Sequence, residues 1–291
     1  MFSIAALVPS PPVLVPELCG GRSGTAGNDP VAEVTRVRAA ALAAVGELAG
    51  IARWTVVGVD AAPSPAGSGS AAGSGAGDSR AGSPAPAHSV TAAPVREFGS
   101  GLAGTFRGFG ADVTVGMSAA ALSAAADPDP DVPLPVLIAA WLRGRAAPGT
   151  RARACLVAAD AAPGDCLAVG ERLRTALDAD PEPHGVLVVA DGARTLSTSA
   201  PGYFQEQAPE VQRRLDDALD AGDRAALRAL DPALCARLGV DGRPAHQVLA
   251  GLFAPDAADP LVRTYYRDAP FGVGYHVSVW RRGDDREGRA R

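Results

Sequence analysis

The sequence contains no lysine, so all of its 27 basic residues are arginines. Schiff-base enzymes, Walker A phosphate loops and protein kinases each need a lysine at a defined place, and these classes are excluded. The four cysteines form no C-x-x-C pair, and no H-x-x-x-H or H-E-x-x-H spacing occurs. Spacing alone therefore predicts no metal site and no disulfide framework, and we expect reduced structural thiols.

Long apolar runs and basic blocks are also missing. No run reaches the roughly 18 residues of a transmembrane helix, and the apolar start Met1–Val8 meets Pro9 too early for a signal peptide. The net charge is −5, with no basic cluster to neutralise a phosphate backbone. We expect a cytoplasmic protein that binds neither membranes nor nucleic acid. A small-molecule ligand and a homo-oligomer are both compatible with the sequence.

One segment differs sharply in composition from the rest. Between Ala61 and Ser89, all residues except Asp78, Arg80 and His88 are Ala, Gly, Pro or Ser. Such a segment cannot bury enough apolar area to offset the entropy of ordering it, so we predict a disordered insertion. The remaining residues 1–280 predict a single domain, followed by a flexible charged tail over 281–291.

Short β-branched runs alternate with longer Ala- and Leu-rich periodic runs, which is typical of α/β proteins. The predicted strands are Ser3–Val8, Trp54–Val59, Asp112–Val115, Ala154–Ala158 and Gly185–Ala190. The predicted helices are Pro30–Ala49, Pro133–Arg145, Gly164–Leu177, Gln205–Ala221, Arg224–Leu230 and Ala245–Phe253. Alternating apolar residues over Leu261–Trp280 predict a β-hairpin. The expected fold is thus a mostly parallel or mixed central sheet flanked by helices, with a C-terminal hairpin-like addition.

Polar side chains follow four of these strands directly: Ser10, Asp60, Asp160 and Asp191. Ligands of open α/β sheets bind outside the carboxyl ends of the strands, so these side chains are expected to share one rim. An Asp after a strand also commonly caps the next helix, and Asp160 fits that alternative best. Asp191 differs because the irregular stretch Gly192–Tyr203 follows it.

We therefore expect Asp191, Asp60 and Ser10 to line the main cleft, with Arg194 and Tyr203 as substrate-binding candidates. Arg194 would be a charge partner for Asp191, and Tyr203 an aromatic wall. The long loop Ser197–Ala208 is either a binding loop or is simply held to the body of the protein by its aromatic residues.

Three histidines fall outside the predicted insertion. His184 precedes its strand, at the end opposite Asp191, and is expected at the surface. His246 lies near a helix start and His276 in the last strand, and both positions favour an ordinary structural role. Whether either histidine reaches the cleft stays open.

Three sequence blocks resemble the class III extradiol ring-cleavage dioxygenase family, which shares its architecture with Memo-like proteins. They are Ile4–Leu18, Val188–Gly192, and Ala200–Tyr203 together with Asp268–Tyr275. The resemblance implies a ferrous iron held by two histidines and a glutamate, a catechol-like substrate and a further acid/base histidine.

This sequence has Ser10 and Asp60 where the family has histidines. The sequence thus predicts a member with a degenerate iron site that binds a small molecule or does other chemistry. Two alternatives stay open: a dioxygenase that brings His246 or His276 into the cleft, and an enzyme whose carboxylates hold a hard cation such as Mg²⁺ or Mn²⁺.

Overall fold

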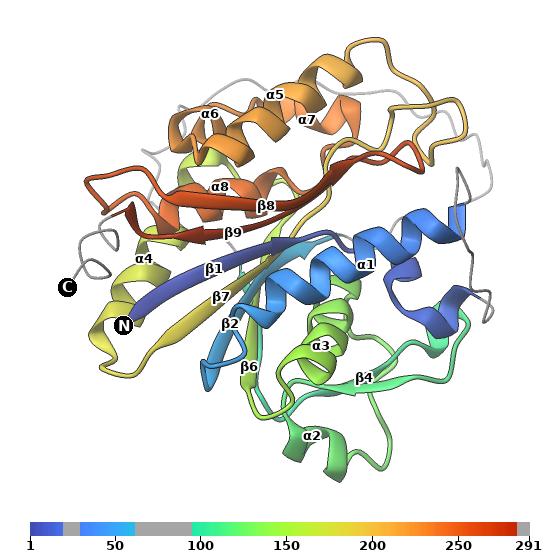
Figure 1. Cartoon of the computed structure of the whole chain (residues 1–291), viewed down its shortest axis with the longest axis vertical. Coiled ribbons are helices and arrows are strands. Elements are labelled where there is room, and N and C mark those ends of the chain that lie inside the picture. The colour runs from blue at the N-terminus through green and yellow to red at the C-terminus, as the bar shows by residue number, and fades with distance from the viewer. Residues whose placement is uncertain (20–29, 62–94, 284–291) are drawn as a thin grey trace, which may run out of the picture.

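The computed structural model describes residues 1–19, 30–61 and 95–283 (Figure 1). The predicted insertion, apart from Ala61, and most of the predicted tail lie outside the described residues. What was predicted for those two segments stays a prediction.

A seven-stranded mixed sheet forms the centre of the molecule, with the order β3-β6-β2-β7-β1-β9-β8. Its strands are β1 (Phe2–Val8), β2 (Arg53–Asp60), β3 (Val95–Phe98), β6 (Arg151–Ala158), β7 (His184–Val189), β8 (Leu261–Asp268) and β9 (Tyr275–Arg281). The four middle strands β6, β2, β7 and β1 are parallel, while β3, β9 and β8 add antiparallel pairs. The predicted α/β class with a mixed central sheet is confirmed.

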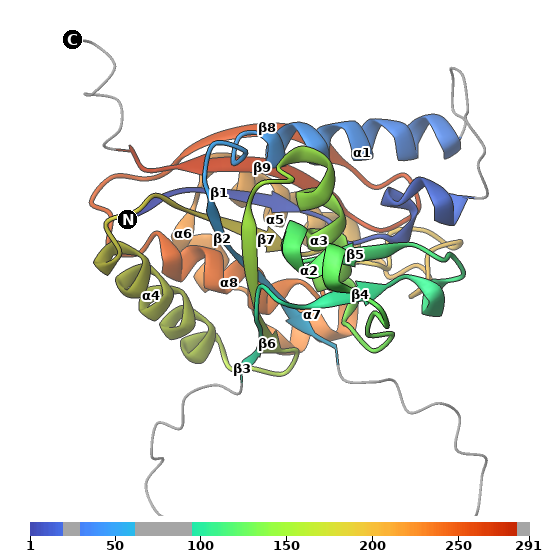
Figure 2. The same ribbon diagram turned by 90° about the horizontal axis from the view of Figure 1, so that it is seen from below.

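Helices cover both faces of the sheet. They are α1 (Pro30–Gly46), α2 (Ala119–Ala124), α3 (Leu134–Ala146), α4 (Pro163–Ala179), α5 (Ala208–Ala221), α6 (Arg224–Arg228), α7 (Pro232–Leu238) and α8 (Arg243–Leu252). Figure 2 shows α1 on one side of the strands and α4 and α8 on the other. The two faces accordingly carry separate hydrophobic cores, one built with α1 and α3 and the other with α4 to α8.

The middle strands can be recognised in the sequence because strands that are buried on both faces consist of nearly continuous apolar residues. In β1, Ile4 belongs to the core under α1 and Leu7 to the opposite core. The hairpin β8–β9 is also as predicted, and Gly272 in its connection has a φ of +69°, which glycine adopts without strain.

Three local expectations were wrong or incomplete. The strand predicted at Asp112–Val115 is β5 (Thr114–Gly116), which pairs with β4 (Ala103–Thr105) in a separate two-stranded sheet. The helices α2 and α7 were not predicted, because each is too short to show a clear apolar period. His184 is buried, not on the surface, because β7 lies between β1 and β2 and its first residue is covered too; its Nε2 lies 3.0 Å from Thr55 Oγ1.

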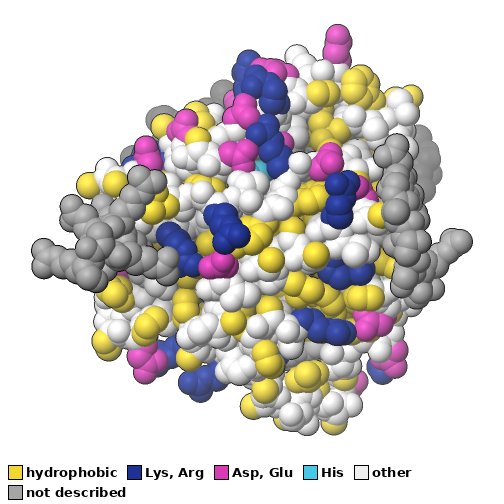
Figure 3. Space-filling view, viewed as in Figure 1, with side chains coloured by type: hydrophobic (Ala, Val, Ile, Leu, Met, Phe, Trp, Pro, Cys, Tyr) yellow, Lys and Arg dark blue, Asp and Glu magenta, His cyan; other side chains and the backbone are white. Residues whose placement is uncertain are grey.

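The molecular surface mixes both signs of charge. On the face shown in Figure 3, arginines are interspersed with acidic side chains, without a broad stripe of one sign. Ion pairs such as Arg267–Asp220 at 2.7 Å and Arg281–Glu47 at 2.7 Å are typical of the described surface. Among the described helices, none combines the length and the apolar character needed to cross a bilayer.

Candidate functional site

A cleft of about 970 Å³ opens at the carboxyl ends of β1, β7, β2 and β6. Ser10, Asp60, Asp191 and Arg194 all line it, as expected from their places after the strands. Asp160 does not, because the chain turns outward after β6 and leaves Ala159 at the cleft with Asp160 exposed. Asp160 does not cap α4 either, since the N-cap residue is Ala162.

Ser10 and Asp191 are joined by two hydrogen bonds at the floor of this cleft. The Ser10 N–H donates to Asp191 Oδ1 at 2.9 Å, and its hydroxyl donates to Oδ2 at 2.6 Å. Just before this point, the Ala190 N–H donates to the Val8 carbonyl at 2.9 Å, so the side-chain pair continues the β1–β7 ladder. The sheet itself thus fixes the orientation of the Asp191 carboxyl group.

The Asp191 carboxylate has no positive charge beside it to offset its own. Among the described residues, no arginine or histidine forms an ion pair with it. Burial raises the pKa of Asp191 above its ordinary value, the hydrogen bonds from Ser10 work against this, and the Asp241 carboxylate adds to it. Tyr275, which also lines the cleft, has a raised pKa because it is buried and because Asp191 is near.

The predicted charge partner of Asp191 is engaged elsewhere. Arg194 donates to Asp241 at 2.8 Å, an ion pair on the rim of the cleft. Tyr203 is 63% exposed and does not line the cleft; its φ of +58° is unusual for a residue with a side chain. The loop instead presents Pro201 to the cleft and is fixed by a bond from the Gly202 N–H to the Arg194 carbonyl at 3.0 Å.

Gln212 of α5 supports the loop that carries Asp191, and sequence reasoning missed it. Its Oε1 accepts from the Ala193 N–H at 2.7 Å, and its Nε2 donates to Asp216 Oδ1 at 2.9 Å. A Cβ added at Gly192 or at Gly274 would lie within 2.3 Å of the Gln212 amide, so a side chain at either position would displace that amide. The available signal was an amide in the apolar stripe of α5, where a buried polar group must serve a partner.

His246 and His276, the two histidines that the sequence analysis considered for the cleft, do not line it. His246 is 1% exposed, and neither ring nitrogen makes a well-formed hydrogen bond, although the Asp191 carbonyl is close. Burial lowers the pKa of His246 to about 4. In β9, His276 is also buried, with its Nε2 2.9 Å from Asp220 Oδ1.

These side chains do not fit the iron set that the sequence resemblance implies. Within the described ranges, no three His, Cys, Asp or Glu side chains are grouped so that they could hold a metal ion. A serine hydroxyl does not replace an imidazole ligand, and Ser10 already uses its hydroxyl proton on Asp191. The carboxylates of the rim do not form a three-ligand set for a hard cation either.

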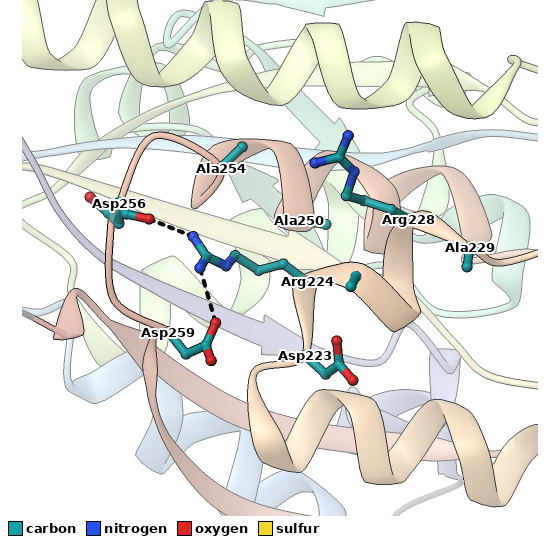
Figure 4. Close-up of a pocket in the computed structure, with 9 residues that line it drawn as sticks. Asp223, Arg224, Arg228, Ala229, Ala250, Ala254, Asp256 and Asp259 are labelled. Carbon is teal, nitrogen blue, oxygen red and sulfur yellow. Dashed lines mark hydrogen bonds and ion pairs between the residues drawn. The ribbon is translucent and has the colours of Figure 1, made fainter.

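A second pocket of about 640 Å³ lies between α6, α8 and the segment that follows α8 (Figure 4). Figure 4 shows Arg224 reaching between Asp256 and Asp259. Its guanidinium donates to the carbonyls of Phe253 and Asp256, each at 2.7 Å, and to the Asp259 carboxylate at 2.9 Å. Arg224 therefore joins these segments through its guanidinium group.

No protein-family model matches the sequence, and no curated protein matches it significantly. The likeness to the extradiol dioxygenase family accordingly rests on the three sequence blocks alone.

Proposed function

We propose that this protein is a degenerate relative of the class III extradiol dioxygenases that binds a small organic molecule in the cleft at the ends of β1 and β7. The observation that carries the proposal is the joining of Ser10 and Asp191 at the floor of a cleft of about 970 Å³. Open α/β sheets bind their ligands at this edge, and the volume is in the usual range for small-molecule sites.

The composition of the cleft wall supports an organic ligand. Apolar residues form much of the wall, and eight polar side chains stand among them: Ser10, Asp60, Arg96, Asp131, Asp191, Arg194, Asp241 and Tyr275. An apolar wall with polar groups that orient the ligand is typical of small-molecule sites. The apolar lining includes Pro11, Pro12, Pro133, Leu134, Pro135, Val189 and Val273.

Blocking the cleft tests the proposal. Ala159 is exposed on the cleft rim, so Ala159→Trp adds a large side chain there at little risk to the core. Ala229→Trp is the matched control, because Ala229 is an exposed alanine of the second pocket. Binding of small aromatic fragments would be followed by saturation-transfer NMR and quantified by titration.

We expect Ala159→Trp to weaken fragment binding by at least about tenfold, which is about 1.4 kcal/mol, and Ala229→Trp to leave it unchanged. Equal binding by both variants, or loss in Ala229→Trp alone, would overturn the assignment of the cleft.

A further inference from the structure

We propose that the ligand of this cleft carries a protonated amine, which is held between the Asp191 carboxylate and the Tyr275 hydroxyl, with an apolar ring along the proline-rich wall. This inference rests on the proposed function and names the chemical class of the ligand.

The first argument is the unbalanced charge of Asp191. The chain has no lysine, and the two arginines of the cleft are both directed at other carboxylates. Arg194 donates to Asp241 at 2.8 Å, and Arg96 lies 3.9 Å from Asp60. Asp191 is half-buried, lines the cleft and receives only the two hydrogen bonds of an uncharged serine, so its carboxylate is available to pair with a cationic ligand at the cleft floor.

Tyr275 supplies a second polar group at the same place. It is 4% exposed and lines the cleft, and its hydroxyl makes no hydrogen bond to any described residue. The Gly192 N–H donates to the Gly274 carbonyl at 2.8 Å, which brings the adjoining residues Asp191 and Tyr275 to the same part of the cleft. The Asp191 charge accordingly contributes to the raised pKa of Tyr275. The hydroxyl is open to the cleft and free to accept a hydrogen bond, so an ammonium group could donate to it and to the carboxylate at once.

The part of the cleft wall that the start of α3 forms does not favour an anionic ligand. The N-terminus of a helix normally attracts anions through its free N–H groups, and α3 begins at the cleft. However, Pro133 and Pro135 have no N–H, and the N–H groups of Val136 and Leu137 both donate to the Pro133 carbonyl. The start of α3 is therefore left with the Leu134 N–H alone, and it forms an apolar wall instead of an anion site.

Three probes that share one ring test the charge preference directly: 2-phenylethylamine, 2-phenylethanol and phenylacetate. They present an ammonium, a neutral hydroxyl and a carboxylate on the same apolar body. NMR titration at pH 7 of the full chain measures each affinity. We expect the amine to bind at least about tenfold more tightly than the alcohol, because hydrogen bonds between charged groups are the stronger ones.

Variants then locate the preference. Asp191→Asn keeps the shape of the side chain and should remove the advantage of the amine, while the affinity for the alcohol stays within about threefold. Tyr275→Phe should weaken amine binding in part, and it serves as an independent variant if Asp191→Asn does not fold. Asp112→Asn is the control for net charge, since Asp112 is an exposed surface residue paired with Arg107 outside the cleft, and it should change nothing.

The possible failures are distinguishable. If the alcohol or phenylacetate binds in the cleft as well as the amine, or if Asp191→Asn keeps the advantage of the amine, the inference about the amine is wrong and the proposed binding function stands. If none of the three probes binds and no aromatic fragment binds either, both are wrong.

Discussion

Replacing Gln212 by methionine tests whether the loop that carries Asp191 is held by a buried amide. Methionine has a similar volume and helix propensity, so packing and local helix stability should change little. The two hydrogen bonds of the amide are lost. The Ala193 N–H, in a fully buried residue, is left without a partner, and Asp216 keeps only its ion pair with Arg267 at 3.6 Å.

A buried polar group that loses its partner costs about 1–3 kcal/mol, so the two losses together should lower the free energy of unfolding by about 2–6 kcal/mol. Urea unfolding at pH 7, analysed by linear extrapolation, measures this. The control is Arg214→Met on the exposed face of the same helix, which should cost less than about 0.5 kcal/mol. A loss for Gln212→Met no larger than that of the control would refute the supporting role of Gln212.

Three further predictions concern the buried titratable groups and iron. Burial raises the pKa of Asp216 to about 6. As the pH rises, the carboxyl group of Asp216 loses its proton in the unfolded chain before it does so in the folded protein. The free energy of unfolding should therefore fall between about pH 4 and pH 6, by at most about 3 kcal/mol. Urea unfolding of Asp216→Asn over the same pH range should not show this fall. Burial lowers the pKa of His246 to about 4, so the unfolded chain takes up a proton at this residue before the folded protein does. The free energy of unfolding should therefore fall as the pH falls from about 6.5 to 4. His246→Leu should be at least as stable as the wild type at pH 7, where an unpaired imidazole is removed, and should lose less stability at pH 5; a large loss at pH 7 would show that the imidazole has a partner. Metal analysis should find no stoichiometric iron in the purified protein, and no ring-opened yellow product should form from catechol with added Fe²⁺ and oxygen; product formation that depends on His246 or His276 would overturn the degenerate-site proposal.

Most of the central sheet and the cleft rim could be predicted because both follow from local sequence, whereas the edge strand β3 (Val95–Phe98) was missed. A strand buried on both faces is a short apolar run, and the residue after it is placed at the carboxyl edge by the strand itself. Ser10, Asp60 and Asp191 were found in this way. Asp160 shows the limit of the rule: like Ser10 and Asp191 it stands two residues after its strand, yet it is exposed and does not line the cleft.

The remainder of the site depends on contacts between distant segments, which no local pattern encodes. Arg194 is close to Asp191 in sequence, yet it pairs with Asp241, 47 positions away. Tyr275 reaches the cleft because β9 lies next to β1, and the aromatic residue chosen from the sequence, Tyr203, faces solvent instead. The Gln212 side-chain amide bonds to Asp216 in its own helix and to the Ala193 N–H, which comes next to it only in the folded protein.

The position of β1 between β7 and β9 also bears on how the protein is made. During synthesis β1 leaves the ribosome well before its two neighbours in the sheet, which are residues 184–189 and 275–281. The Ser10–Asp191 bonds join positions 181 residues apart. The apolar strand β1 therefore stays unpaired until both neighbouring strands have been translated. Strand pairing between segments so far apart in the sequence is also slow. The edge that carries the cleft would thus be completed late, and nascent chains would need protection of this strand from aggregation until then.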